Sequence, residues 1–158
     1  MKSEGLEQSG GEDGQRQATG PFRPHIVLLY CENAAVKGTP AISATAEAKE
    51  YSVRMEILPC SSKVEADHIL KIVENGADGV EVVSCPAGKC RSLDGNVRAA
   101  NRVGYAGKFL GQIGMGAERV GITQGVGLTT KALLEIAEKR ASAVAPLGIN
   151  PMKSGGIR

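Results

Sequence analysis

The sequence predicts a single α/β domain with a four-stranded, mostly parallel sheet flanked by helices. Three short apolar runs, at residues 25–30, 54–58 and 79–83, have the length and branched side chains of buried strands. The stretches between them resemble helices, and the runs recur at about the ~30 residues of one strand–helix–strand unit. This alternation predicts parallel neighbours in one sheet, joined by right-handed crossovers. At 158 residues, the chain has room for one such domain.

The first part of the domain begins with a strand over residues 25–30, directly after Pro24. A helix is expected over residues 42–51, because this stretch is rich in Ala, Glu and Lys. The second strand covers residues 54–58 and ends at Pro59, which cannot continue the ladder.

The middle of the chain predicts a second helix and a third strand. The helix covers residues 64–75 with an apolar stripe, and Gly76 is well placed as its left-handed cap. The strand over residues 79–83 is apolar apart from Glu81. Such a run suits a central strand that is covered on both faces.

The last part of the domain predicts a long helix, a short strand and a final helix. Asp94 offers an N-cap for a helix that ends at about residue 113. A fourth strand is expected over residues 119–123, and a helix over residues 131–144 would be capped by one of two threonines, Thr129 or Thr130. The order of elements is flavodoxin- or Rossmann-like.

The sequence divides into a domain with a tail on each side. Residues 1–22 are rich in Gly, Glu, Gln and Ser without periodicity, and we expect a disordered N-terminal tail. The α/β domain itself would cover residues 23–145. Residues 146–158 contain several Pro and Gly residues, which predict a flexible C-terminal tail that could dock onto a partner.

Composition excludes several classes of function. The formal charge of +2 is too small to predict nucleic acid or an anionic membrane as a partner. No segment approaches the ~18–20 apolar residues that cross a bilayer, and the N-terminus lacks the apolar run of a secretory signal. We therefore expect a cytoplasmic protein, in which clustered cysteines are metal ligands or redox groups rather than disulfides.

The four cysteines follow the predicted strand ends. Cys31 directly follows the first strand, Cys60 and Cys85 come two residues after the second and third strands, and Cys90 follows shortly after. The carboxyl ends of parallel strands share one sheet edge, where open α/β folds bind their ligands. All four thiols are therefore expected to gather on one point. Four thiolates suit a [2Fe–2S] or [4Fe–4S] cluster. The alternatives are a zinc ion and four unrelated buried cysteines.

The segment from Ser84 to Cys90 has small residues that let the chain turn back toward one metal centre. Its backbone N–H groups could hydrogen-bond the sulfurs and tune a reduction potential. Lys89 and Arg91 are expected to lower the thiol pKa values. No Ser/His/Asp constellation supports hydrolytic chemistry, so no catalytic residue is predicted.

Together these residues resemble the delta-subunit family of methyl-viologen-reducing hydrogenases, the small iron–sulfur subunits that serve heterodisulfide reductases. The resemblance extends from about residue 26 to residue 122. It rests on the following motifs in this order: Cys31-Glu32-Asn33, Leu58-Pro59-Cys60-Ser61, Asn75-Gly76-Ala77-Asp78-Gly79-Val80, Cys85-Pro86-Ala87-Gly88-Lys89-Cys90, and Asp94-Gly95-Asn96 followed by Arg102-Val103.

The resemblance implies an oxidoreductase subunit that carries one [2Fe–2S] cluster and has no substrate of its own. Its ligands would be Cys31, Cys60, Cys85 and Cys90. Members of the family pass electrons between a hydrogenase or formate dehydrogenase and the flavin-containing large subunit of heterodisulfide reductase. Related subunits occur in other complexes of anaerobic metabolism, including one type of benzoyl-coenzyme A reductase.

One departure from the family pattern keeps other functions open. The family usually has a second cysteine three residues after the first, and here that position is Ala34, which leaves four of the usual five. The main alternative is therefore an adaptor subunit of such a complex that binds zinc or no metal. A flavodoxin-like FMN site is a further alternative. It predicts Ser/Thr-rich phosphate loops, and residues 32–35 contain no hydroxyl group.

Overall fold

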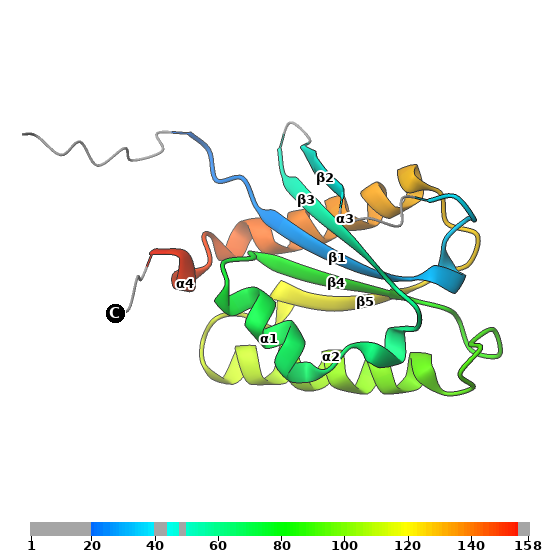
Figure 1. The fold of residues 1–158 in the computed structure, drawn as a ribbon. Coiled ribbons are helices and arrows are strands. Elements are labelled where there is room, and N and C mark those ends of the chain that lie inside the picture. Colours follow the sequence, from blue (N-terminus) through cyan, green and yellow to red (C-terminus); the bar gives the residue numbers. More distant parts are fainter. Residues whose placement is uncertain (1–19, 40–43, 48–49, 155–158) are drawn as a thin grey trace, which may run out of the picture.

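The computed structural model describes residues 20–39, 44–47 and 50–154, and it contains a five-stranded sheet with the order β2-β3-β1-β4-β5 (Figure 1). Four strands run parallel to one another, and these are β1 (His25–Cys31), β3 (Ser52–Leu58), β4 (Gly79–Ser84) and β5 (Val120–Gln124). The fifth, β2 (Ala44–Glu47), pairs antiparallel with β3. The predicted α/β fold with a mostly parallel sheet is therefore confirmed.

Helices cover both faces of the sheet. Figure 1 shows α1 (Ala66–Glu74) and α2 (Gly95–Gln112) on one face and α3 (Thr130–Val144) on the other. Each face has its own apolar core, because alternate residues of the central strands point to opposite sides. Short 3-10 helices complete the chain, namely η1 (Glu32–Ala34), η2 (Ser61–Lys63), η3 (Ala117–Arg119) and η4 (Ala145–Leu147).

The helix predicted over residues 42–51 is wrong. Residues 44–47 form β2, and β3 begins at Ser52, while residues 42–43 and 48–49 lie outside the described part of the chain. Helix propensity is a weak preference per residue. The exposed edge of β3 offers hydrogen-bond partners that β2 uses, as the pairing of Thr45 with Arg54 shows.

The other predicted elements are present with small shifts of their ends. Gly76 follows α1 with a φ of 102°, a backbone conformation that favours glycine. The Thr129 hydroxyl accepts a hydrogen bond from the Ala132 N–H and caps α3 as predicted. Asp94 occupies the N-cap position of α2, but its carboxylate instead accepts a hydrogen bond from Arg98 Nε at 3.0 Å.

The buried Glu81 of β4 has two side-chain partners. Arg140 Nε donates to one carboxylate oxygen at 2.6 Å, and the Thr123 hydroxyl donates to the other at 2.7 Å. A buried carboxylate needs such partners because it has lost its hydration. This explains how a charged residue stands in the otherwise apolar central strand.

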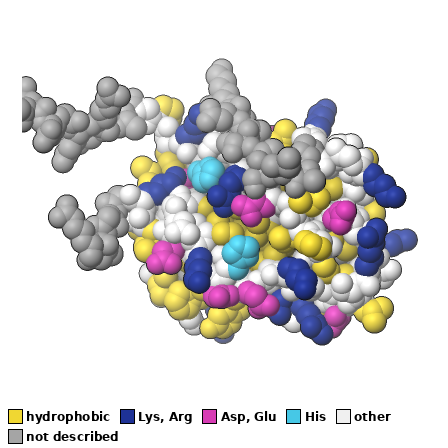
Figure 2. All heavy atoms as spheres, in the orientation of Figure 1, with side chains coloured by type: hydrophobic (Ala, Val, Ile, Leu, Met, Phe, Trp, Pro, Cys, Tyr) yellow, Lys and Arg dark blue, Asp and Glu magenta, His cyan; other side chains and the backbone are white. Residues whose placement is uncertain are grey.

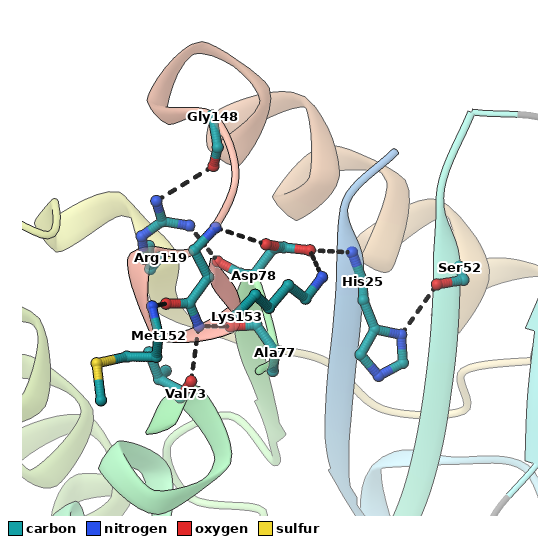
Figure 3. A network of polar contacts seen from close by, with 10 residues as sticks. His25, Ser52, Val73, Ala77, Asp78, Arg119, Gly148, Met152 and Lys153 are labelled. Atoms are coloured by element: carbon teal, nitrogen blue, oxygen red, sulfur yellow. Dashed lines mark hydrogen bonds and ion pairs between the residues drawn. The ribbon is translucent and has the colours of Figure 1, made fainter. Parts of the chain in front are cut away.

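A polar network at the amino end of the sheet holds the C-terminal segment in place (Figure 3). The Asp78 carboxylate, with no exposed surface, accepts hydrogen bonds from the backbone N–H groups of His25 at 2.8 Å and Asn150 at 2.9 Å, and it pairs with Lys153. The Asn150 amide in turn donates to the carbonyls of Val73 and Ala77. The network joins β1, β4 and α1 to the end of the chain.

The C-terminal segment is therefore part of the fold as far as it is described. Residues 145–147 form η4, and α4 (Pro151–Ser154) follows the buried Asn150, whereas the sequence predicted a flexible tail from residue 146. Residues 155–158 lie outside the described part, as do residues 1–19 of the predicted N-terminal tail. Within the described ranges, no helix is both long and apolar enough to cross a membrane.

Candidate metal centre

The strand register brings the cysteine-bearing segments to one edge of the sheet. Cys31, the last residue of β1, pairs with Leu58 of β3, and Tyr30 pairs with Val83 of β4. Cys60 and Cys85 each come two residues after these partners. The predicted placement of the cysteines at the carboxyl edge is therefore confirmed, and all four are free of disulfides.

Cys31 and Cys85 form a buried pair. Their Sγ atoms lie 3.7 Å apart, and each residue is 1% exposed. The side-chain amide of Asn33 donates to Cys85 Sγ at 3.6 Å and to the Lys89 carbonyl at 2.9 Å, so it ties η1 to the loop after β4. Burial raises the pKa of the Cys85 thiol, and the neighbouring Cys31 raises it further.

Cys60 and Cys90 form a second, half-buried pair at the start of α2. The Cys60 thiol shares a hydrogen bond with Cys90. Both sulfurs lie against Gly95, the first residue of the helix. A Cβ atom built on Gly95 would lie 2.8 Å from Cys60 Sγ and 3.1 Å from Cys90 Sγ. Only a residue without a side chain therefore leaves room for both sulfurs at this point.

Hydroxyl groups set the acidity of Cys60. Burial alone would raise the pKa of its thiol, but hydrogen bonds from Ser62, Ser92 and Cys90 together lower it to about 7. The predicted causes were the cations of Lys89 and Arg91, and neither contributes to this shift. About half of the Cys60 side chains are therefore thiolate, the form that binds metals, at pH 7.

The sequence predicted that all four sulfurs gather on one point, but in the structure they lie in two pairs. Among the described residues, no group of three or more His, Cys, Asp or Glu side chains is placed to hold one metal ion. The two pairs are nevertheless neighbours, because Cys90 packs against the apolar cluster that contains Cys31 and Cys85. The edge therefore offers two sets of two thiols.

Ala34, at the position of the missing family cysteine, is buried in η1. It has no exposed surface and belongs to the same apolar cluster as Cys31 and Cys85. Its backbone carbonyl accepts a hydrogen bond from the Leu128 N–H at 2.9 Å. The methyl group is therefore part of the apolar core that contains the first pair of cysteines.

Sequence reasoning missed the residues that surround the sulfurs. Asn33, Ser62, Ser92 and Gly95 each contact a cysteine, and none was singled out for this role. Gly95 carried no clear signal, because the penalty for glycine applies to the interior of a helix and not to its start. The serine contacts depend on side-chain directions that no sequence pattern encodes.

Comparison with known proteins places the chain in a family. Residues 26–148 match the family described as methyl-viologen-reducing hydrogenase, delta subunit. The chain belongs to this family. The match includes all four cysteines and every strand of the parallel part of the sheet, and it confirms the resemblance found from the motifs.

Individual relatives of this delta-subunit family member are named as iron–sulfur subunits of hydrogenases. The chain is 26% identical to the vhu iron–sulfur subunit of an F420-non-reducing hydrogenase from Methanocaldococcus jannaschii over 130 residues, which are 82% of this chain and 97% of the relative. It is 30% identical to a protein of the same name in Methanococcus maripaludis over 131 residues, 83% of this chain and 98% of that one.

A third relative is much longer. The chain is 29% identical over 97 residues to one subunit of the ferredoxin/F(420)H(2)-dependent CoB-CoM heterodisulfide reductase of Methanosarcina acetivorans. The match covers 61% of this chain but 12% of that protein. A segment similar to this domain thus forms part of a longer polypeptide.

Proposed function

We propose that this protein is an electron-transfer subunit that holds a [2Fe–2S] cluster through Cys31, Cys60, Cys85 and Cys90. It would relay electrons between a hydrogenase- or dehydrogenase-type module and a heterodisulfide reductase-like flavin/iron–sulfur subunit. The observation that carries the proposal is the arrangement of four free thiols as two pairs at one sheet edge. Family membership and the names of the relatives support it.

The donor set fits a two-iron group. A [2Fe–2S] cluster takes four cysteine thiolates, two on each iron. Two thiolates on one tetrahedral metal with ~2.3 Å bonds lie about 3.8 Å apart. The 3.7 Å between Cys31 Sγ and Cys85 Sγ agrees with this separation. Cys60 and Cys90 would supply the second iron, and Gly95 leaves the space that their sulfurs need.

The surrounding residues would orient and tune such a group. When bound, the cluster would accept and release one electron at a time. Asn33 donates an N–H to Cys85 Sγ. Hydrogen bonds to the sulfurs stabilise the additional negative charge of a reduced cluster and so make its reduction easier. The buried Cys31 and Cys85 exclude water from one side. We expect no substrate to bind to the protein itself.

Metal and sulfide analysis of anaerobically purified protein tests the proposal. We expect about two irons and two acid-labile sulfides per chain, together with an electron paramagnetic resonance signal after dithionite reduction. Cys85→Ser and Cys90→Ser should each strip the iron or shift the spectrum, whereas Ser142→Ala, on the exposed side of α3, should change neither. An unchanged spectrum in both cysteine variants would refute the ligand assignment.

The second candidate is an adaptor protein that binds zinc or no metal. It is favoured by Ala34 at the family cysteine position and by the lack, among the described residues, of a three-ligand group around one point. Equal concentrations of zinc and protein without sulfide would establish a zinc adaptor. Protein that stays free of metal after anaerobic reconstitution with iron and sulfide would establish a metal-free one.

A further inference from the structure

The second pair of cysteines marks the accessible side of the proposed cluster. Cys31 and Cys85 are 1% exposed, whereas Cys60 and Cys90 are half-buried. The residues that follow Cys90 and lead into α2 are all exposed and lie next to this pair in the chain. A partner that exchanges electrons with this protein would approach closest at that loop.

The most exposed apolar side chain in the described residues lies in this loop. Leu93 is 89% exposed, and with a φ of 59° it is the one non-glycine residue with a positive φ in the described part of the chain. Such a conformation costs roughly 1–3 kcal/mol for a residue other than glycine. Turn hydrogen bonds hold it, from Leu93 N to the Cys90 carbonyl and from Asp94 N to the Ser92 carbonyl.

The exposure of Leu93 is not explained by the fold of this chain. A leucine directly before an N-cap often packs back onto the first turn of its own helix. Leu93 instead points into solvent, and Val97 on that first turn is also 55% exposed. The two side chains provide an apolar centre beside the half-buried cysteines.

Exposed basic side chains lie at the same edge of the sheet as this apolar centre. Four exposed basic side chains follow the strand ends, namely Lys37, Lys63, Lys89 and Arg91. The ion pairs found among the described residues engage none of the four, although nearby Arg98 and Arg102 do pair with Asp94 and Glu65. Figure 2 shows Lys and Arg side chains gathered at the right-hand side, where the cysteine-bearing edge lies in Figure 1.

Two of these four basic side chains, from segments far apart in the sequence, are neighbours in space. A hollow of about 370 Å³ lies at this edge, and Lys37 of the segment after η1 and Arg91 of the loop before α2 line it, together with Val36 and one acidic residue, Glu32. An apolar centre within a polar rim is the usual composition of a protein–protein interface.

We propose that Leu93 and Val97, with the basic side chains Lys89 and Arg91 of the same loop, form a surface, here called the Leu93 surface, that docks a redox partner protein. The partner surface would be acidic, with an apolar recess for Leu93. The proposal rests on the proposed function, because it assigns the side from which the electron leaves. A protein is favoured over an anionic membrane because the relatives are named as subunits of multisubunit enzymes.

Affinity measurements with the heterodisulfide reductase-like flavin protein of the same organism test the proposal. Leu93→Gly removes the side chain and relieves the backbone, so the fold should be retained. We expect about tenfold or greater weakening of binding, the loss typical of a central interface residue. The double variant Lys89→Glu/Arg91→Glu should slow association and reduce its dependence on salt.

Matched controls lie far from the Leu93 surface. Ile113→Ser removes an apolar side chain of similar size, 52% exposed, at the other end of α2, and Lys108→Glu/Lys139→Glu reverses two exposed charges in the second halves of α2 and α3. Both should bind as the unaltered protein does. Equal affinity of the Leu93→Gly and control variants, or no binding by the unaltered protein, would overturn the docking proposal.

Iron and sulfide content separates this proposal from the proposed function. Variants of the Leu93 surface should keep the metal content of the unaltered protein while binding weakens. Metal should be lost in the cysteine variants and in no variant of the Leu93 surface, so the cysteine variants test the cluster independently of docking. Binding to vesicles of phosphatidylcholine and phosphatidylglycerol that exceeds binding to the partner, and that Leu93→Gly abolishes, would assign the Leu93 surface to a membrane and overturn the proposal.

Discussion

The Sγ atoms of Cys31 and Cys85 lie 3.7 Å apart although the two residues are 54 positions apart in the sequence. The neighbouring parallel strands β1 and β4 bring them together, because their paired residues fix where both chains leave the sheet. The separation is therefore set by the sheet and does not require a bound metal. A site prepared in this way loses little conformational entropy when a metal binds.

Replacement of Gly95 by alanine should remove the metal without unfolding the protein. The added Cβ would lie 2.8 Å from Cys60 Sγ, so the sulfurs at the start of α2 would have to move. We expect iron and sulfide per chain to fall to less than about half, while circular dichroism remains that of the folded protein.

Gly104→Ala is the matched control for Gly95→Ala. Gly104 lies on the exposed side of the same helix, and a Cβ there would meet no atom within 4 Å. Alanine should stabilise the helix by about 1 kcal/mol and leave iron unchanged. Full iron content in Gly95→Ala would show that the sulfurs can shift freely at this position.

The thiols of the metal-free protein should react in a fixed order. Cys60, with its pKa lowered to about 7, is about half thiolate at pH 7, whereas the pKa of Cys85 is raised and its thiolate is scarce. Brief iodoacetamide treatment at pH 7 should therefore modify Cys60 well before Cys85, as peptide mass spectrometry would detect.

Acidity at Cys60 should depend on the neighbouring hydroxyls. The Ser62→Ala and Ser92→Ala variants each remove a hydrogen bond that lowers the Cys60 pKa, so each should slow its alkylation at pH 7. The rates should converge at pH 10, where every variant is ionised. A pH-independent difference would indicate altered access instead of altered acidity.

Replacement of Asn33 should shift the reduction potential while the metal stays bound. Its amide donates to Cys85 Sγ at 3.6 Å and stabilises the additional negative charge of the reduced cluster. Asn33→Leu should therefore make the potential more negative in a dithionite titration. Asn101→Leu, at an exposed position of α2, should leave it unchanged. A more positive potential in Asn33→Leu would contradict this role of the amide.

The network around Asp78 should contribute strongly to stability. Asp78→Ala leaves the buried N–H groups of His25 and Asn150 without their acceptor. We expect the free energy of unfolding to fall by about 3 kcal/mol in urea denaturation. Lys153→Ala, which removes a half-exposed partner, should cost no more than about 1 kcal/mol. Similar losses in both would assign the stability to the ion pair alone.

Much of the fold follows from patterns along the chain, and the errors have physical causes. Apolar residues and their spacing predicted β1, β3 and β4. A parallel central strand such as β1 or β4 is apolar on both faces, whereas β3 alternates apolar residues with the ion pair of Arg54 and Glu56. β2 was missed since its four residues carry no β pattern, and its conformation is decided by the free edge of β3. The position of the C-terminal segment depends on Asn150, a buried polar residue whose burial cannot be predicted from hydrophobic periodicity.

The sequence predicted the edge of the sheet at which the cysteines gather, but it did not predict how their sulfurs are paired. Cysteines at strand ends predicted which residues would gather, because parallel strands share their carboxyl edge. Their division into Cys31 with Cys85 and Cys60 with Cys90 depends on loop conformations after the strands. The hydrogen bonds of Ser62 and Ser92 depend on the same loops.

The Asp78 network also decides where the chain can be attached to something else. It fixes Asn150 and the start of α4 beside the first residue of β1, so both ends of the described chain leave from the side opposite the cysteines (Figures 1 and 3). A linker at the C-terminus could therefore anchor the protein to an electrode with its sulfur-bearing end turned outward. The same layout would also allow a similar segment to form part of a much longer polypeptide, such as the Methanosarcina relative.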